Sequence, residues 1–358
     1  MLVKNGKLVL LQGVEKGDIR ILEDKIVEIG KDLSQLDGEQ VVDAAGKFVT
    51  AGFIDIHTHG VNGVDTMDSE LAEMSRYYLA HGTTTWYPTT MTMSEEDIIK
   101  ACHANTVIEG GANIPGFHME GPFINIKYKG AQNGKYVIPP SMELFNKCEH
   151  IKIVTVAPEV EGSLEFIREC PAVVALGHTE VDYDLAMAAF KAGAKCLTHT
   201  FNVMPSIHHR KPGPVPAGAD ADAYAQLICD GVHVHPSVVR MLVKLYGTDR
   251  VVLISDSMRA TGLGDGVYDL GGQAITVTDG KAYTDGGNLA GSTATLFDCV
   301  KCAIAFGIPE ADAVKMASEV PANLMGINKG KIQVGYDADY ILVDGDFNLV
   351  TAYASGRV

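Results

Sequence analysis

The pattern of apolar and polar residues changes near residue 51. Before that point, short apolar runs alternate with turn-forming pairs such as Asn5-Gly6 and Ala45-Gly46, which is typical of short strands. The predicted strands run from Lys7 to Leu11, Asp18 to Leu22, Lys25 to Ile29 and Gln40 to Asp43. From Ala51 onward, apolar runs recur along the chain, and helical stretches with polar faces lie between them.

Eight apolar runs after this point predict buried strands. They are Gly52 to His57, Thr83 to Pro88, Ile114 to Glu120, Ile151 to Ala157, Val173 to His178, Lys195 to His199, Gln226 to Asp230 and Val251 to Asp256. The helices predicted between them are Ser69 to Ala80, Ser94 to Ile108, Leu164 to Glu169, Asp182 to Ala192 and Pro236 to Leu245. Strands that are buried on both faces and alternate with helices form parallel sheets, and eight such units favour a closed (β/α)8 barrel. A doubly wound open sheet is the alternative, but Gly60 to Gly63 lacks the glycine pattern of a dinucleotide-binding crossover.

The rest of the chain predicts an insertion, three helices and a return to strands. Gly264 to Gly287 is rich in glycine and aspartate and predicts a hairpin with strands Gln273 to Thr278 and Lys281 to Thr284. The later elements are helices Ser292 to Phe306, Pro309 to Ser318 and Pro321 to Met325, and strands Gly330 to Val334, Ala338 to Val343 and Leu349 to Ala354. Because both ends of the chain carry short strands, residues 1–50 and 330–358 predict one small β domain, and residues 51–329 predict the barrel.

Composition narrows the classes of function. Asp and Glu outnumber Lys and Arg by 45 to 29 in the 358 residues, and the formal charge of −16 opposes binding to nucleic acid. No apolar run has the length of a membrane span, and the first residues form a turn before a signal-peptide core, so we expect a cytoplasmic protein. The seven cysteines predict reduced thiols, and Cys299 and Cys302 lie in a helical pattern that predicts no metal site.

Residues that bind metals or transfer protons lie where most of the barrel strands end. They are His57, His59, His118, Glu120, His178, His199, Asp230, His233 and Asp256. The carboxyl ends of all strands converge on one face of a barrel, where active sites lie. The sequence therefore predicts that these distant segments form one site. His81, His103 and His150 lie in or beside predicted helices, and we interpret them as structural or surface residues.

The residue types favour a site for one or two divalent cations. His57 and His59 are two positions apart on a strand, so their side chains point to the same face. Imidazole and carboxylate groups are suitable ligands for Zn²⁺ or Fe²⁺. Asp256 is expected beside the metal-bound water, and His118 could approach the site from the same face as Glu120. The expected ligands are Glu120, His178 and His199 for one ion, and His57 and His59, bridged by Glu120, for a second.

Motifs at these strand ends resemble a known family. The segment from Gly52 to Gly60 resembles the metal-dependent amidohydrolase superfamily, and six further motifs, in register along the whole chain, resemble its N-acetylglucosamine-6-phosphate deacetylase family. These motifs are His118 to Phe123, Gly177 to Thr179, Thr198 to Met204, Asp230 to His233, Ser255-Asp256 and Leu289 to Ser292. The resemblance implies a barrel with an appended β domain and a metal-dependent site. Many superfamily members carry a carboxylated lysine at the end of strand four, but here Thr155 to Glu159 contains no lysine, and Glu120 replaces it.

The resemblance also implies a role for each matching residue. Glu120, His178 and His199 match the principal metal ligands. Asp256 matches the catalytic acid and base, and His233 matches a substrate contact that polarises the acetyl carbonyl. The residues that match substrate contacts are Asn202 and the backbone of Val203 at the phosphate, Arg210 reaching the phosphate across a dimer interface, and Ala131, Gln132, Leu289, Ala290 and Gly291 along the substrate.

Two positions depart from the family pattern. Some members have His where this chain has Gln132, so that sugar contact must be made differently here. The form Asn-Ala-Met is common where this chain has Val203, and we expect little effect because the backbone makes the contact. Arg210 lies in the densest basic patch of the chain, Ser206 to Pro212, which is either a solvated loop or a local phosphate clamp.

These expectations combine into one reaction. We expect hydrolysis of the acetamide of N-acetylglucosamine 6-phosphate by metal-activated water, with Asp256 as general base and then general acid. The expected partners are a small phosphorylated amino sugar and a second copy of the chain. The alternatives are deacetylation of N-acetylgalactosamine 6-phosphate, hydrolysis of another amide such as a cyclic one, and a catalytically inactive barrel scaffold. The missing strand-four lysine argues against cyclic amides, and the complete ligand set argues against a scaffold.

Overall fold

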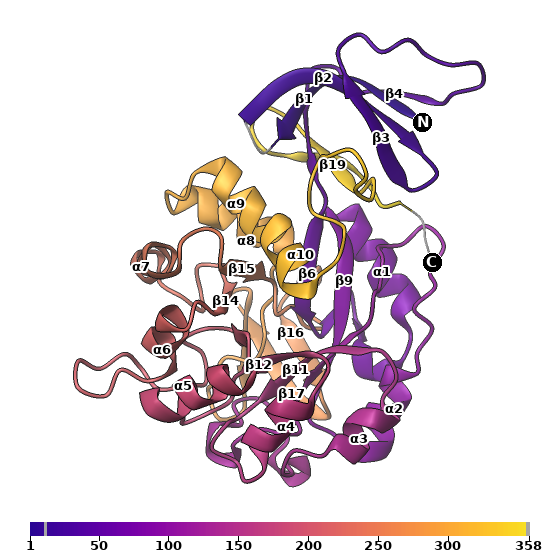
Figure 1. Ribbon diagram of the computed structural model, residues 1–358. Helices are drawn as coiled ribbons and strands as arrows, with labels where there is room; N and C mark the ends of the chain where they lie inside the picture. Colours follow the sequence, from indigo (N-terminus) through magenta and orange to yellow (C-terminus); the bar gives the residue numbers. More distant parts are fainter. Residues whose placement is uncertain (11–12, 356–358) are drawn as a thin grey trace.

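The structure is a computed structural model that describes residues 1–10 and 13–355. Leu11, the last residue of the first predicted strand, and residues 356–358 of the predicted terminal domain lie outside this part. Within it, a barrel of alternating strands and helices carries a separate β-sheet at one end (Figure 1).

Eight parallel strands form the barrel, in the order in which they occur along the chain. They are β6 (Phe53–Thr58), β9 (Thr83–Thr90), β10 (Phe117–Glu120), β11 (Ile151–Val156), β12 (Val173–Leu176), β13 (Cys196–Leu197), β14 (Tyr224–Ile228) and β15 (Val251–Ile254). Every residue of β6, β9 and β15 is buried, as expected for strands covered on both faces. The first and last strands meet just beyond β15, where the Asp256 N–H donates to the His57 carbonyl at 2.9 Å. The predicted barrel is therefore confirmed.

Helices surround the barrel strands. They are α1 (Leu71–Ala80), α2 (Glu95–Cys102), α3 (Met142–Lys147), α4 (Ser163–Glu169), α5 (Tyr183–Ala192), α6 (Pro214–Asp220), α7 (Pro236–Tyr246), α8 (Leu296–Ala305), α9 (Glu310–Ala317) and α10 (Glu319–Met325). Side-chain caps begin several of them: Asp182 accepts from the Leu185 N–H, and Thr295 and Asp298 form a capping box.

Two helices were not predicted, and helix α2 ends well before its predicted end. Helix α6 contains two prolines and a glycine, which disfavour helix, but it buries Val215 and Ala217. Helix α3 is six residues long, too short for a clear periodic pattern. Helix α2 ends at Cys102 and not at Ile108, because Asn105 bonds to the backbone of Val107 and holds the chain in a turn.

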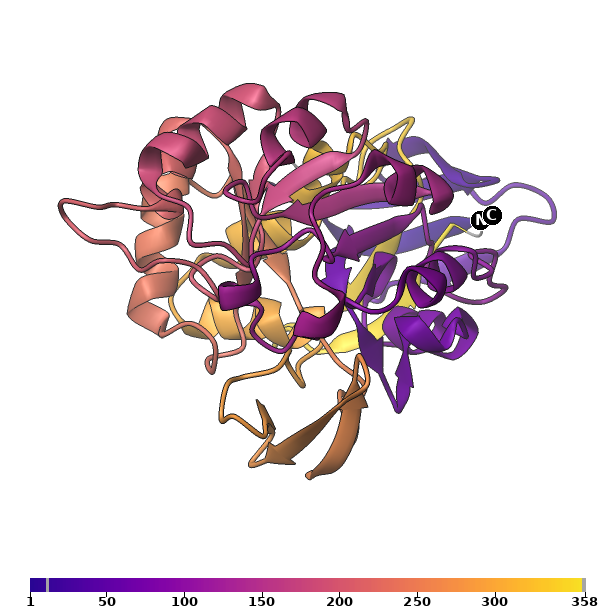
Figure 2. The same cartoon turned by 90° about the horizontal axis from the view of Figure 1, so that it is seen from below.

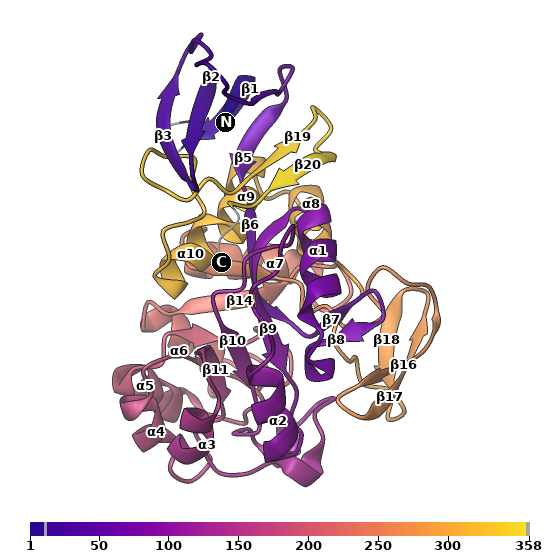
Figure 3. The same ribbon diagram turned by 90° about the vertical axis from the view of Figure 1, so that its right-hand side faces the viewer.

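Strands from both ends of the chain form one terminal sheet (Figure 3). They are β1 (Leu2–Leu10), β2 (Gly13–Leu22), β3 (Lys25–Gly30), β4 (Val41–Asp43), β5 (Phe48–Ala51), β19 (Tyr340–Val343) and β20 (Leu349–Tyr353). Strand β19 pairs antiparallel with β5, so the C-terminal strands complete the N-terminal sheet. The strand predicted from Gly330 to Val334 is wrong: Gly330 has φ +79°, which interrupts an extended chain, although Ile332 is buried in the core of this sheet.

The insertion after β15 is a three-stranded antiparallel sheet that stands apart from the barrel (Figure 2). It consists of β16 (Gly266–Leu270), β17 (Gln273–Thr278) and β18 (Lys281–Thr284). The two predicted strands are confirmed, and β16 adds a third. Short elements complete the description: β7 (Gly60–Val61), β8 (Val64–Asp65), η1 (Thr66–Asp68), η2 (Ile126–Tyr128) and η3 (Gly134–Tyr136). Across residues 1–10 and 13–355, no helix has the length and apolarity needed to cross a membrane.

Candidate active site

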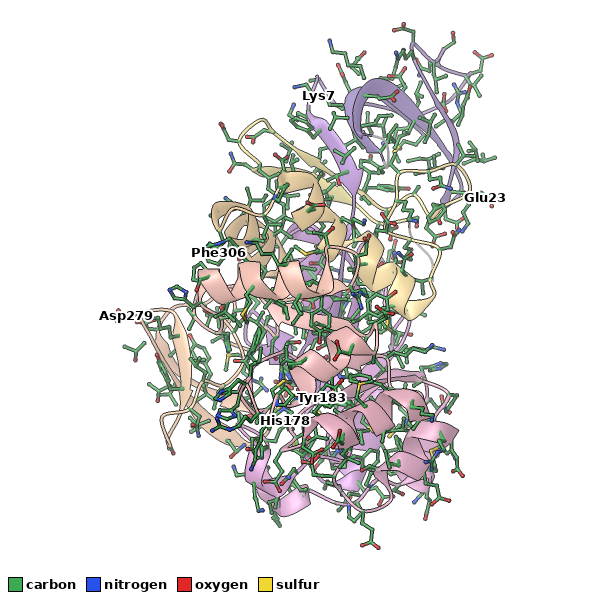
Figure 4. All side chains as sticks on the ribbon, turned by 60° about the vertical axis from the view of Figure 1, so that its left-hand side comes forward. Lys7, Glu23, His178, Tyr183, Asp279 and Phe306 are labelled. Atoms are coloured by element: carbon green, nitrogen blue, oxygen red, sulfur yellow. The ribbon has the colours of Figure 1, made fainter. Side chains whose placement is uncertain are left out.

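The predicted site residues lie together at the carboxyl ends of the barrel strands. His57 lies in β6 and Glu120 ends β10, whereas His178, His199 and Asp256 each follow a strand by two residues. Their side chains are buried, and that of Asp256 is the most exposed at 10%. Figure 4 places His178 in the barrel, far from Lys7 and Glu23 of the terminal sheet.

Three of these residues have a backbone conformation that is uncommon for residues other than glycine. His178, His199 and Asp256 have φ values of 48°, 26° and 48°. Each is the residue at which the chain leaves its strand and turns across the barrel mouth. Non-glycine residues in this region carry a conformational cost, and such residues cluster at functional sites.

Glu120 lies at the centre of two groups of potential ligand atoms. Its Oε1 lies 3.2 Å from His178 Nε2 and 3.0 Å from His199 Nε2, and these two nitrogens are 3.1 Å apart. The same carboxylate lies 3.2 Å from the Nε2 atoms of both His57 and His59. All ligand atoms within each group lie within 4.8 Å of one another.

Three of the histidine rings are oriented by hydrogen bonds at the nitrogen that faces away from Glu120. The Nδ1 atoms bond to carbonyl oxygens: His57 to Gln226 Oε1 at 3.0 Å, His59 to the Thr89 carbonyl at 3.1 Å, and His178 to the Tyr128 carbonyl at 2.9 Å. Because a carbonyl oxygen can only accept, Nδ1 carries the proton in each ring. The Nε2 of each ring therefore faces the site, where it can bind a cation once its own proton is lost, as in a metal-binding histidine.

The arrangement fits a divalent cation. The three separations around Glu120 Oε1, His178 and His199 match the edges of a tetrahedron of ligands about Zn²⁺, which are roughly 3.3 Å long. His57 Nε2 is buried and has no hydrogen-bond partner within residues 1–10 and 13–355. A cation between these atoms satisfies the facing lone pairs, so the residues fit the group.

Asp256 lies beside the second group of ligand atoms. Its Oδ1 is 3.5 Å from His57 Nε2 and 3.4 Å from His59 Nε2. Burial alone would raise the pKa of Asp256, but the charge of His57 and the hydrogen bond from His59 lower that pKa to about 2. The carboxylate is therefore ionised at neutral pH and able to accept a proton.

His233 lies beside these residues and is held in place by Asp230. Asp230 Oδ2 accepts from His233 Nδ1 at 2.7 Å, and Oδ1 accepts the backbone N–H groups of Val232 and His233. Burial lowers the pKa of His233, but the bond to Asp230 outweighs burial and the net pKa is raised. The protonated ring keeps an N–H on its other nitrogen, which can donate to a substrate.

His118 does not join the ligand groups. Its Nδ1 donates to the Ile56 carbonyl at 3.0 Å, and its Nε2 accepts from Thr155 Oγ1 at 2.8 Å. Burial and the neighbouring His57 keep the pKa of His118 well below its ordinary value. Both ring nitrogens are occupied, so His118 is a structural residue behind the site.

A cavity of about 490 Å³ opens above the ligand atoms, within the size range of small-molecule sites. The predicted substrate residues that line it are Ala131, Gln132, Asn202, Val203, His233, Leu289 and Gly291. Two others do not. Ala290 is buried and bonds to the Ala282 carbonyl. Arg210 is exposed, and the segment between β13 and α6 that carries it extends away from the barrel (Figure 1).

The chain after His199 forms a candidate anion-binding segment. His199, Phe201 and Val203 have positive φ, whereas the residues between them do not. This alternation is typical of a backbone nest, whose N–H groups converge on an anion. The Asn202 side chain donates to the His199 carbonyl at 3.1 Å, which stabilises the turn.

The sequence model of the Amidohydrolase family matches residues 48–358. The chain belongs to the Amidohydrolase family. It is 35% identical to the N-acetylglucosamine-6-phosphate deacetylase of Bacillus subtilis (strain 168), over 96% of this chain and 93% of that protein. It is 33% identical to the N-acetylgalactosamine-6-phosphate deacetylase of Escherichia coli O157:H7, over 89% of each. A structure of a mutant N-acetyl-D-glucosamine-6-phosphate deacetylase from Mycobacterium smegmatis, in complex with N-acetyl-D-glucosamine-6-phosphate, covers 100% of this chain and 98% of its own with a TM-score of 0.90 at 30% identity.

This amidohydrolase site also contains residues that sequence reasoning did not assign to it. Gln226 bonds to His57 and also accepts the His199 N–H, and Tyr128 contributes its carbonyl to His178. Gln132, which the sequence placed along the substrate, also bonds directly to Glu120. A polar Gln226 among the buried residues of β14 was the one signal in the sequence, because buried polar residues need partners. Tyr128 contributes only its backbone carbonyl to this contact, so its side chain leaves no signal in the sequence.

Proposed function

We propose that this amidohydrolase hydrolyses N-acetylglucosamine 6-phosphate to glucosamine 6-phosphate and acetate. The observation that carries the proposal is the juxtaposition of Asp256 with two groups of cation ligands, all beneath one cavity. Relatives named for this reaction match nearly the whole chain and support the substrate.

We assign one or two divalent cations, Zn²⁺ or Fe²⁺, to the two ligand groups. Glu120, His178 and His199 form the first, and His57 and His59 share Glu120 in the second. When bound, a divalent cation makes water a better nucleophile near neutral pH and polarises a carbonyl oxygen.

Asp256 is the proposed general base and general acid. Its ionised carboxylate accepts the proton of the water that attacks the acetyl carbon. It then returns this proton to the departing nitrogen, which is a poor leaving group as an amide anion. His233 donates its free N–H to the acetyl oxygen as negative charge develops there. Asp230 keeps that ring protonated and oriented.

The remaining proposed contacts hold the substrate. The backbone nest around Asn202 and Val203 receives the phosphate, and Arg210 of the partner subunit completes its site in a homodimer. This assignment agrees with the exposure of Arg210 outside its own cavity. Binding of the distant phosphate orients the acetyl group for attack. The residues proposed along the sugar ring are Ala131, Leu289 and Gly291, which line the cavity.

N-acetylgalactosamine 6-phosphate is the second candidate substrate. The Escherichia coli O157:H7 relative is named for deacetylation of this sugar, and its 33% identity is close to the 35% of the Bacillus subtilis relative. The two sugars differ in the orientation of one hydroxyl group, and no motif in the sequence distinguishes them.

Acetate release by the full-length chain, reconstituted with Zn²⁺ or Fe²⁺, tests the proposal. N-acetylglucosamine 6-phosphate, its galacto epimer and unphosphorylated N-acetylglucosamine are compared at equal concentrations. We expect the highest kcat/KM for the first sugar. Faster release from the epimer would select the second candidate. No release from any sugar by protein that retains its cation would overturn amino-sugar deacetylation.

A further inference from the structure

Gln132 connects the loop that lines the cavity to the central carboxylate of the site. Its side-chain Nε2 donates to Glu120 Oε2 at 2.6 Å, and its Oε1 accepts the Thr92 N–H at 2.7 Å. The side chain is 2% exposed, so these bonds are made away from bulk water. The sequence predicted a sugar contact for this residue, which lines the cavity, and its amide nitrogen faces Glu120.

The two oxygens of Glu120 have different surroundings as a result. Oε1 faces His57, His178 and His199, whereas Oε2 lies between Gln132 Nε2 and His59 Nε2. The terminal torsion of a glutamate is broad, so nothing within the side chain itself selects this orientation. The bond from Gln132 fixes the plane of the carboxylate.

The loop around Gln132 is itself anchored. The Gln132 N–H donates to the Lys129 carbonyl at 2.8 Å, and the side chain of Gln273, in β17, donates to the Ala131 carbonyl. The amide of Gln132 is therefore a fixed donor, set by the loop on one side and by Thr92 on the other. A fixed donor can hold Glu120 in its ligand geometry before a cation binds.

We propose that Gln132 is a positioning residue that sets the affinity of the site for its cation. By holding Oε2, it turns Oε1 toward His178 and His199 and makes this group the tighter of the two. Hydrogen bonds to metal ligands from surrounding residues change metal affinity by about 10–100-fold. The inference rests on the proposed cation site and is independent of which sugar is the substrate.

Zn²⁺ titration of the chelator-stripped full-length chain against a competing chromophoric chelator tests this role. Gln132→Met keeps the length of the side chain and removes the donor. We expect the dissociation constant of the tighter Zn²⁺ to rise about 10–100-fold. Gln132→Ala, which admits water beside Glu120, serves as the second variant if Gln132→Met fails to fold. Asn133→Ala is the matched control, because Asn133 caps the next turn of the same loop without touching Glu120.

Two further measurements separate positioning from a merely structural effect. The Co²⁺-loaded Gln132 variant should show a changed visible absorption spectrum, whereas the thermal midpoint of the stripped variant should stay close to that of the wild type. Zn²⁺ affinity within twofold of wild type, in a variant that is folded, overturns the proposal. Failure of the chain to deacetylate any sugar, with the affinity difference intact, would instead count against the proposed function alone.

Discussion

At the scale of single residues, the site is organised through the atoms that face away from it. Three imidazoles bond through Nδ1 to carbonyl oxygens, which turns their Nε2 atoms toward Glu120. His118 differs from them because both of its nitrogens have partners. The hydrogen-bond partners of the ring nitrogens thus decide whether a histidine is a candidate ligand or a structural residue.

Asp256→Asn tests the assigned base at this scale. The amide cannot accept the proton of the attacking water, so turnover should fall by about 10²–10⁴-fold. Bound metal should remain, because Asp256 lies outside the two closest ligand groups. Acetate release and metal content measured on the same sample check both statements. Retained turnover would remove Asp256 from the role.

Asp230→Asn tests the charge state of His233. In the wild type, Asp230 holds the pKa of His233 above its ordinary value, and loss of the carboxylate lowers it. If the protonated ring is the active form, activity is lost as pH rises through this pKa. The alkaline limb of kcat/KM should therefore move to lower pH in the variant. Imidazole NMR titration measures the pKa directly, and an unmoved limb despite a lowered pKa would exclude the protonated ring.

At the scale of secondary-structure elements, strand ends carry the chemistry and strand interiors carry the packing. The residues two positions after β12, β13 and β15, which are His178, His199 and Asp256, have positive φ values. The interior of β6 instead packs against β9, with which it pairs in parallel. Short strands suffice for this purpose, as β13 contains two residues and still positions His199.

Gly52→Ala tests the close contact at the start of the barrel. An added Cβ would lie 2.2 Å from Thr84 Oγ1 and 2.3 Å from its Cγ2, where the start of β6 meets β9. Such overpacking should lower the free energy of unfolding by about 1–3 kcal/mol. Urea unfolding measures this change. Gly264→Ala is the control, since its Cβ would meet nothing within 4 Å, and an equal loss there would show that the contact with Thr84 is not the cause.

At the scale of the whole molecule, the C-terminal segment is tied to the barrel by a buried carboxylate, that of Asp339. Asp339 accepts from Lys329 at 2.7 Å, from Ser355 of the C-terminal segment at 2.7 Å and from Thr85 of β9 at 3.2 Å. Its partners thus come from the tail and from a barrel strand. The cavity lies elsewhere, at the carboxyl ends of the strands, so the terminal sheet takes no direct part in the proposed chemistry.

Arg210→Ala tests the proposed contact between subunits. Loss of the guanidinium should raise KM for the phosphorylated sugar and leave unphosphorylated N-acetylglucosamine unaffected, because only the former carries the group that arginine binds. Lys211→Ala, next to it in the same exposed loop, is the matched control. An equal effect on both sugars would remove Arg210 from phosphate binding, and a monomeric wild type in sedimentation experiments would remove the shared site.

The sequence by itself determined the barrel and which residues gather at the candidate site. Apolar runs that are buried on both faces imply parallel strands covered by helices. The carboxyl ends of such strands converge on one face of a barrel, so His57, Glu120, His178 and His199 could be placed together without coordinates. Tertiary structure decided what each side chain does there. The Gln132 bond to Glu120 and the exclusion of His118 depend on where a side chain points beyond a strand end. Contacts of this kind join residues distant in the chain, whereas a linear pattern reports burial and period.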